Sequence, residues 1–522
     1  MAGKHRFPFL IHRSSWPAGL LRQRAIAALA LVLLVPIVFA GCSAAQRGPQ
    51  AMRRTWQEVQ VGDIRVVSQL SEKQTLKFAE DLQRFQQVAG SLTGGARVKP
   101  RVPTQLVVVG DERTYSEDAR GPEDTAGYFH RGLRSNLAVA KRTRYGDLME
   151  TVLHEYLHFL LENQGRLGLP AWYDEGFAQF LSSTEFDDDE VKIGGIPLSA
   201  GSAILTQKPL PVAELVTAEN LHEWSDTRTT RFYGTSWELV HYLILTSPTR
   251  DAFPDQLTRY LKETGRGGDP VRSFEAAFGL STKEADAALS ARRKRGYPVL
   301  TVDLPIDATH EPQVQPLAPA EVALVLGDLH LRRNAPADAR VWYERALEME
   351  PDMPHALSGL ADTWKFEGDF EKAEPLFQRA LALAPEDPLI LLDMGEYYDS
   401  LSRSVPDPDE RRRLRKKERS YYARANRIAP DMPETFVVNG LSHARDRERD
   451  AQAMQKALAS LEHAHTLLPG NADVTHRLAD AYLIAGDREA AAVMIAALGA
   501  EGHSRGRGDQ LKRLRARLEK LP

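Results

Sequence analysis

An internal period of 34 residues in the C-terminal half constrains the fold of this 522-residue chain more than any other feature. Small and large apolar residues recur at this spacing, and so does a proline: the pairs are Gly327 and Ala361, Ala339 and Ala373, Tyr343 and Phe377, Ala346 and Ala380, and Pro351 and Pro385. Small residues at fixed positions let paired helices approach closely, and the large ones fill the space between them. The period therefore predicts a stack of helix pairs.

The repeats continue beyond these two with one interruption. The next equivalent proline, Pro430, comes 45 residues after Pro385, so the third repeat carries an eleven-residue insertion that includes the basic run 411–419. Because Asp409, Glu410 and Glu418 lie beside or within that run, we interpret it as a solvated extension of a repeat helix and not as an anion-binding patch. A fourth repeat ends at Pro469, and a weaker fifth begins at Ala472.

This pattern is identified as the signature of tetratricopeptide (TPR) repeats. It implies an all-α TPR solenoid over residues 320–500, in which each repeat is stabilised by its neighbours. The amphipathic segment at 501–522 is expected to cap the stack. We also expect the concave face of the solenoid to bind a protein segment, from either a substrate or a partner.

The N-terminus has the architecture of an export signal. Basic residues precede an unbroken apolar run from Ala25 to Ala40, which contains Pro36 and is shorter than the roughly 20 residues of a membrane span. The tail FAGC resembles the lipobox of bacterial lipoproteins, which implies that residues 1–41 are removed and that Cys42 is acylated. A plain signal or a signal anchor is the alternative. Ser43 favours the periplasmic face of the outer membrane, with residues 42–60 as a tether.

The remaining composition restricts the chemistry. Cys42 is the only cysteine in the chain, so no internal disulfide can form and a zinc site must use histidine, aspartate or glutamate. The net charge of −4, with 67 basic and 71 acidic residues, gives no electrostatic reason to expect a nucleic-acid partner. A chain of this length should form two or three domains.

Between the tether and the repeats, the pattern predicts an α+β domain over residues 61–300. Segments 63–70, 104–110 and 136–140 are expected strands, and residues 71–90 have a helical period with Ser71 as the N-cap. Helices should dominate from Tyr145 to about Arg295. The Pro-rich segment 301–319 is the expected linker to the repeats.

Residues 154–158 read HEYLH, two histidines four apart with Glu155 directly after the first. On a helix, residues four apart share one face, so His154 and His158 can direct their imidazoles at one metal ion. Glu175 follows on a helix that starts at Pro170, and it can face the histidines if that helix returns antiparallel. Three protein ligands with an open fourth position are typical of a catalytic zinc site.

This combination resembles the gluzincin metallopeptidases of the peptidase-MA-like superfamily. The block after HEYLH matches L-P-x-W-x-x-E-G-x-A-x-x-L through Leu169, Pro170, Trp172, Glu175, Gly176, Ala178 and Leu181. The resemblance implies a zincin-like α+β fold from Asp63 to about Pro298, with His154, His158 and Glu175 as zinc (Zn2+) ligands. It also implies that Glu155 is the general base and that residues 126–140 form a β-ribbon whose edge pairs with substrate.

Further roles follow from the same resemblance. Some gluzincins place an aspartate four residues after the glutamate ligand, where it orients the first histidine. Gln179 occupies that place here, and its amide oxygen is expected to accept the imidazole N–H. An oxyanion donor is expected from a downstream Tyr or His, with Tyr233 as the first candidate and His241 as the second. Either residue could equally serve in packing.

These features predict an exported, lipid-anchored zinc metallopeptidase of the cell envelope, fused to a TPR array. Zinc and Glu155 would activate a water for attack on a peptide carbonyl. One alternative is a periplasmic TPR scaffold whose zinc domain is not catalytic, and another is an amide hydrolase that acts on cell-wall material. An intact Glu155 argues against the scaffold, but the sequence does not separate protein from cell-wall substrates.

Overall fold

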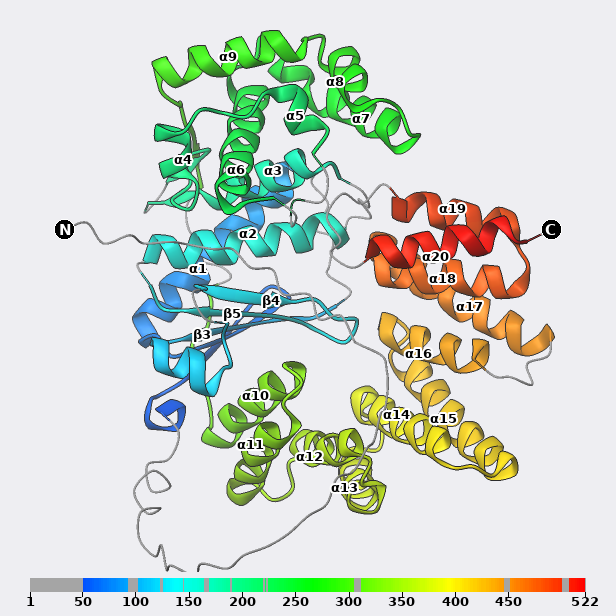
Figure 1. Ribbon diagram of the computed structural model, residues 1–522. Coiled ribbons are helices and arrows are strands. Elements are labelled where there is room, and N and C mark those ends of the chain that lie inside the picture. Colours follow the sequence, from blue (N-terminus) through cyan, green and yellow to red (C-terminus); the bar gives the residue numbers. More distant parts are fainter. Residues whose placement is uncertain are drawn as a thin grey trace, which may run out of the picture.

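A computed structural model of the chain describes residues 50–92, 102–122, 125–143, 145–163, 169–187, 190–218, 221, 224–304, 311–445, 451–499 and 507–521. Within these ranges a mixed α/β region comes first and a helical, TPR-like array follows (Figure 1). The predicted signal segment and Cys42 lie outside the described residues. None of the described helices is both long and apolar enough to span a membrane.

A six-stranded sheet organises the first half of the chain, in the order β4-β5-β3-β2-β1-β9. Its strands are β1 (Gln57–Val61), β2 (Ile64–Ser68), β3 (Thr104–Val109), β4 (Gly127–His130), β5 (Asn136–Lys141) and β9 (Gln315–Pro316). β2, β3 and β5 run parallel, and the other neighbours are antiparallel. The three predicted strands are β2, β3 and β5. The predicted ribbon is the β4–β5 pair, with β4 at one edge of the sheet.

The strands bury side chains on both faces of the sheet. On one face, Val66 and Val108 pack against α1 (Glu72–Leu92) and α2 (Tyr145–Asn163). On the other face, Val67 and Val107 pack against α10 (Pro319–Arg332), the first helix of the array. Because successive strand residues point to opposite faces, one apolar run supplies both cores. The first repeat therefore shares its core with the sheet.

Helices dominate the layer beyond α2, as the sequence predicts. They are α3 (Ala171–Ser182), α4 (Gly201–Thr206), α5 (Val212–Val216), α6 (Asp226–His241), α7 (Phe253–Gly265), α8 (Pro270–Phe278) and α9 (Thr282–Arg295). In Figure 1 they lie on the side of α2 that faces away from the sheet. Trp172, Trp237 and Phe274 are fully buried in this layer. A small sheet of β6 (Glu185–Phe186), β7 (Glu190–Ile193) and β8 (Leu300–Asp303) joins it.

The array contains five helix pairs within the described residues, and it forms an arc beside the α/β region (Figure 1). After α10 come α11 (Pro336–Met349), α12 (Pro354–Glu367), α13 (Phe370–Leu383), α14 (Pro388–Ser404), α15 (Pro408–Ile428), α16 (Pro433–Ala444), α17 (Ala451–Leu467), α18 (Ala472–Ala485) and α19 (Arg488–Gly499). The basic run lies on the long helix α15, where Arg413 pairs with Glu410 at 3.3 Å. It is a helix extension, as predicted.

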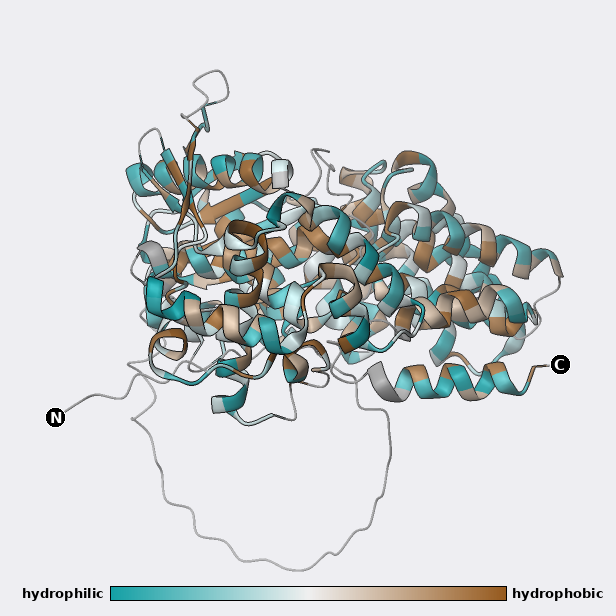
Figure 2. Ribbon diagram, turned by 90° about the horizontal axis from the view of Figure 1, so that it is seen from above, coloured by the Kyte–Doolittle hydropathy of each residue, from teal (hydrophilic) through white to brown (hydrophobic). Residues whose placement is uncertain are grey.

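The 34-residue period reflects close helix contacts. A Cβ on Gly327 would lie 2.6 Å from the ring of Tyr343, and a Cβ on Gly395 would lie 2.2 Å from the ring of Tyr422. Glycine at these positions therefore lets the aromatic ring of the second helix pack against the backbone of the first. The final helix, α20 (Arg507–Glu519), alternates hydrophilic and apolar residues (Figure 2) and buries Leu514 against the fifth pair.

The Pro-rich segment 301–319 is tied to both sheets at its ends. β8 pairs with β7 in the small sheet, and Gln315 and Pro316 pair with β1 in the large one. Residues 305–310 between them lie outside the described residues. The segment therefore contributes a strand to each sheet before the array begins.

Candidate metal centre

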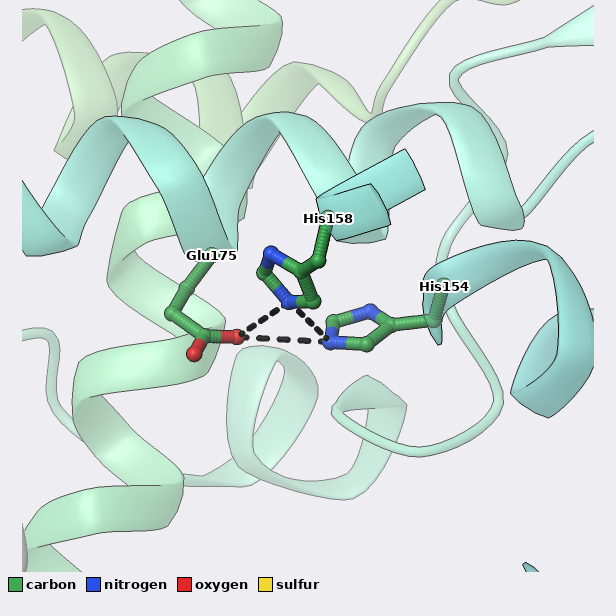
Figure 3. Close-up of side chains that lie close together, drawn as sticks. All are labelled: His154, His158 and Glu175. Carbon is green, nitrogen blue, oxygen red and sulfur yellow. Dashed lines mark hydrogen bonds and ion pairs between the residues drawn. The ribbon is translucent and has the colours of Figure 1, made fainter. Parts of the chain in front are cut away.

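Two neighbouring helices carry the predicted metal ligands. α2 buries Leu153, Leu157 and Leu161 in the core, and His154 and His158 lie one turn apart on another face of the same helix. α3 begins after Pro170 and packs beside α2, which brings Glu175 to the histidines. Figure 3 shows the three side chains converging on one point. The structure thus brings together the three residues that the spacing predicts.

The three ligand atoms form a compact triangle. His154 Nε2 and His158 Nε2 are 3.1 Å apart, and Glu175 Oε2 lies 3.3 Å from the first and 3.5 Å from the second. Ligands bound to a tetrahedral zinc ion at about 2.0–2.2 Å lie roughly 3.3–3.5 Å from one another. The residues and their spacing therefore fit a zinc ion held by two imidazoles and one carboxylate.

Asp174 contacts the ring nitrogen of His158 that faces away from the triangle. Its Oδ1 lies 3.1 Å from His158 Nδ1. A carboxylate that accepts the Nδ1–H fixes the tautomer whose Nε2 lone pair can bind a metal, and it makes that nitrogen more basic. Asp174 was not predicted from the sequence. Its place directly before a predicted ligand, in the first turn of α3, is the signal that could have identified it.

Burial makes this cluster dependent on positive charge. The side chains of His158 and Glu175 are 5% and 3% exposed, and that of His154 is 12% exposed. Burial by itself lowers the pKa of His158, but the carboxylates of Asp174 and Glu175 raise it well above its ordinary value. Burial by itself raises the pKa of Glu175, but the two imidazoles lower it well below its ordinary value. A buried carboxylate in this setting requires a cation beside it, either a protonated imidazole or a metal ion.

Gly176 sets the position of the helix that carries Glu175. A Cβ on Gly176 would lie 2.5 Å from the backbone oxygen of Ser236 and 2.9 Å from Val240, both on α6. The backbones of α3 and α6 can therefore approach this closely only because residue 176 has no side chain. The glycine that follows the predicted ligand is thus a packing requirement of the site.

The predicted general base, Glu155, is half-buried on α2 directly after His154. Tyr233 lies on α6, the helix that packs against α3, and its half-buried ring contacts the ring of Phe232 at a centroid distance of 5.9 Å. The catalytic roles of both residues stay predictions.

One other predicted role is wrong in this structure, and a second gains no support from it. Gln179 lies a full turn beyond Glu175, is 4% exposed, and its Oε1 accepts no hydrogen bond among the described residues, so it does not hold His154. The carboxylate that orients a ligand is Asp174, and it acts on the second histidine.

His241 is completely buried, and its Nε2 lies 2.9 Å from the carbonyl oxygen of Pro298. Burial lowers its pKa to about 4, so the ring is neutral near pH 7 and its one N–H is the one that Pro298 accepts, which makes His241 a buried packing residue here.

Comparisons with known proteins identify the array and leave the α/β region without a family. Residues 330–391 match the tetratricopeptide repeat family. The chain is similar to a thermophilic TPR protein of Thermus thermophilus, at 24% identity and a TM-score of 0.33, over 38% of this chain and 99% of that one. It is also similar to pilF of Pseudomonas aeruginosa, at 19% identity and a TM-score of 0.32, over 38% and 84% of the two chains. Likenesses this distant carry no conclusion about function.

A curated relative is protein adenylyltransferase Fic of Drosophila grimshawi, which is 34% identical over 110 residues. The match covers 19% of this chain and 21% of the relative, so this chain spans about a fifth of the relative's length. The chain thus consists of a mixed α/β region followed by a TPR-like helical array. Arrays of this type mediate protein–protein interaction.

Proposed function

We propose that this protein is a zinc metallopeptidase of the gluzincin type, with His154, His158 and Glu175 as the metal ligands. The observation that carries the proposal is the buried triangle of two Nε2 atoms and one Oε2 atom at the spacing of tetrahedral zinc ligands. Structural zinc sites are closed by four protein ligands. Among the described residues the cluster contains three, which supports a catalytic site with a position left for water or substrate.

The residues around the triangle have distinct proposed tasks. Bound zinc would supply Lewis acidity, polarising the scissile carbonyl and lowering the pKa of the attacking water. Glu155 would take the proton from that water and pass it to the leaving amine. Asp174 would hold His158 in the tautomer that binds the metal. Tyr233 is the proposed hydrogen-bond donor to the developing oxyanion.

An extended peptide is the proposed substrate. β4 is an edge strand of the large sheet, and α2, which carries both histidines, packs against β4 and β5. The free edge of a strand can pair with the backbone of an extended chain, and a peptide offers the matching donors and acceptors. This edge favours a peptide over an amide of cell-wall material, although the latter would use the same metal ion and base.

A second candidate function is a TPR scaffold whose metal domain is not catalytic. The five helix pairs and the TPR match of residues 330–391 favour it. The position of Glu155 directly after a metal-ligand candidate argues for catalysis, because a binding module has no need of a base there.

We also propose that the protein is exported and anchored by a lipid on Cys42, at the periplasmic face of the outer membrane. The proposal rests on the FAGC motif and on Cys42 being the only cysteine. The variant Cys42→Ala should leave the membrane fraction or accumulate with an uncleaved signal segment. If it stays anchored and fully functional at the wild-type length, the apolar run is itself the anchor.

Metal analysis and a substrate comparison test the proposed activity. Purified wild-type protein should contain about one zinc ion per chain and should cleave an unfolded protein such as reduced casein. A chelator should stop the cleavage, and added zinc should restore it. Asp147→Asn changes a carboxylate on α2, the helix that carries the two histidines. As the control, it should keep the zinc content and the cleavage of wild type. If the protein released fragments from cell-wall material but did not cleave casein, the proposed peptide substrate would be wrong. If the protein were active without zinc, the proposed metal site would be wrong.

A further inference from the structure

The turn between β4 and β5, residues 131–135, inserts into the TPR array. We call it the ribbon turn. The hairpin that it closes extends toward α14 and α16 (Figure 1). Its polar contacts with the array come from α10, α14 and α16, each of which is the first helix of a TPR pair.

Arg134 forms the centre of this contact. Its Nη1 lies 2.6 Å from Asp393 Oδ1, its Nε lies 2.9 Å from Glu434 Oε2, and its Nη2 lies 3.5 Å from Glu396 Oε1. The side chain of Arg134 is 25% exposed, and those of Asp393 and Glu434 are 8% and 15% exposed. One guanidinium thus joins two consecutive repeats, because Asp393 and Glu396 are on α14 and Glu434 is on α16. The planar fork of arginine suits this arrangement better than lysine would.

Flanking contacts seat the same turn. Leu133 packs against the apolar cluster of the fourth and fifth repeats, which includes Val437 and Leu461. On the other side, Arg332 of α10 donates hydrogen bonds to the carbonyl oxygen and the hydroxyl of Ser135. The ribbon turn is therefore held by the first repeat and by the fourth at once.

The carboxylates in this face need the arginine. Asp362, Asp393 and Glu396 lie close enough to hold a cation. Lys365 pairs with Asp362 at 2.5 Å and with Glu396 at 3.2 Å. Lys365 and Arg134 form the ion pairs that join these three carboxylates and Glu434. Without Arg134 the buried excess of negative charge would grow, which is unfavourable away from water.

The ribbon turn also adjoins the helix of the candidate metal centre. A small pocket is lined by Arg131 and Gly132 of the turn, by Phe159 of α2, and by Leu468 and Asn471 of the array. Phe159 directly follows a proposed metal ligand. The turn, the array and the metal-ligand helix therefore meet at one place.

We propose that this face of the TPR array is the receptor for the chain's own ribbon turn, and that the Arg134 clamp fixes the edge strand β4 beside the metal centre. The array then acts as a positioning device for the substrate-binding edge, and Arg134 is a positioning residue. The catalytic consequence rests on the proposed function, but the docking itself does not. The protein segment that the repeats bind is in this case internal to the chain.

The full-length protein with Arg134→Ala tests the clamp, with hydrogen exchange of the amides in 127–141 as the first readout. Exchange should become at least about tenfold faster, because removing one partner of a buried charge cluster is strongly destabilising. With an unfolded protein as substrate, KM should rise several-fold while the zinc content stays that of wild type. Arg134→Lys should give an intermediate result, because an ammonium cannot reproduce three directed contacts.

Arg120→Ala is the matched control. Arg120 pairs with Asp338 of α11 at 2.5 Å, so it also joins the α/β region to the array, but both side chains are exposed. This variant should leave exchange and KM unchanged. If Arg134→Ala does not fold, Glu434→Gln removes one contact of the same clamp and should accelerate the same amides. Wild-type exchange in these variants would overturn the proposal. Faster exchange in a protein that shows no hydrolysis even as wild type would uphold the clamp and refute the peptidase.

Discussion

Asp174 and His158 are joined across the contact of α3 with α2, with Asp174 Oδ1 at 3.1 Å from His158 Nδ1. The next residue, Glu175, places its Oε2 3.5 Å from the other nitrogen of the same ring. Two consecutive carboxylates of one helix therefore bracket one imidazole. One of them orients the ring, and the other shares the proposed metal ion with it.

Asp174→Asn should weaken zinc binding by about 10- to 100-fold, because a neutral acceptor makes the His158 Nε2 less basic and holds the ring less firmly. Competition with a chromophoric chelator would measure the change. Asp255→Asn, an exposed carboxylate in the first turn of α7, provides the control. An affinity equal to that of wild type would mean that Asp174 plays no part in metal binding.

Local patterns predicted the three residues that converge at the candidate site and most elements of the fold. The HEYLH spacing fixes two side chains on one helix face whatever the rest of the chain does, and the block around Glu175 predicts the returning helix. Ser71 was predicted as an N-cap, and its Oγ does accept the backbone N–H of Gln74 at 3.3 Å. Each of these features depends on residues that are near one another in the sequence.

Features that depend on distant residues were missed or assigned wrongly. Arg134 and Asp393 are 259 positions apart, so no local pattern links the ribbon turn to the array. The role of Gln179 also depends on distant residues, because the position of α3 is set by its packing against α2 and α6. Both features depend on tertiary packing, which cannot be predicted from local patterns in a single sequence.

Gly176→Ala should destabilise the protein by about 1–3 kcal/mol, because the new Cβ overlaps the backbone of α6 and α3 must shift. Zinc affinity should fall with it, since Glu175 is the preceding residue. Thermal unfolding and zinc competition would measure both effects. Gly265→Ala at the end of α7, where a Cβ meets nothing within 4 Å, should be neutral or slightly stabilising. Equal melting temperatures for the two variants would contradict the packing argument.

Glu418 on α15 should make the array less stable as the pH rises. Burial raises the pKa of this carboxyl from 4.5 to about 7, and its side chain is 3% exposed. A raised folded-state pKa means that the contribution to stability is complete below about pH 4.5 and is lost as the pH rises through about 7.

Glu418→Gln should therefore be more stable than wild type at pH 8, by at most about 3 kcal/mol, and should show little gain at pH 4.5. Melting temperatures of the two proteins at both pH values would test this expectation. A constant difference across that range would show that ionisation of Glu418 is not its cause.

The two glutamates of the candidate site have different proposed tasks, and their variants should separate metal binding from catalysis. Glu175 is a proposed metal ligand, so Glu175→Ala leaves two imidazoles and should lose most of the zinc together with all activity. Glu155 is the proposed base, so Glu155→Gln should keep its zinc while turnover falls by roughly 100- to 10,000-fold.

Zinc content and turnover measured side by side in Glu155→Gln, with wild type and Glu175→Ala in parallel, test the central claim most directly. We predict about one zinc ion per chain in Glu155→Gln, at the wild-type level, with turnover reduced at least roughly 100-fold. Glu175→Ala should hold little zinc in the same analysis. Cleavage by Glu155→Gln at the wild-type rate, or retention of zinc by Glu175→Ala, would contradict the account and leave the TPR scaffold as the better description.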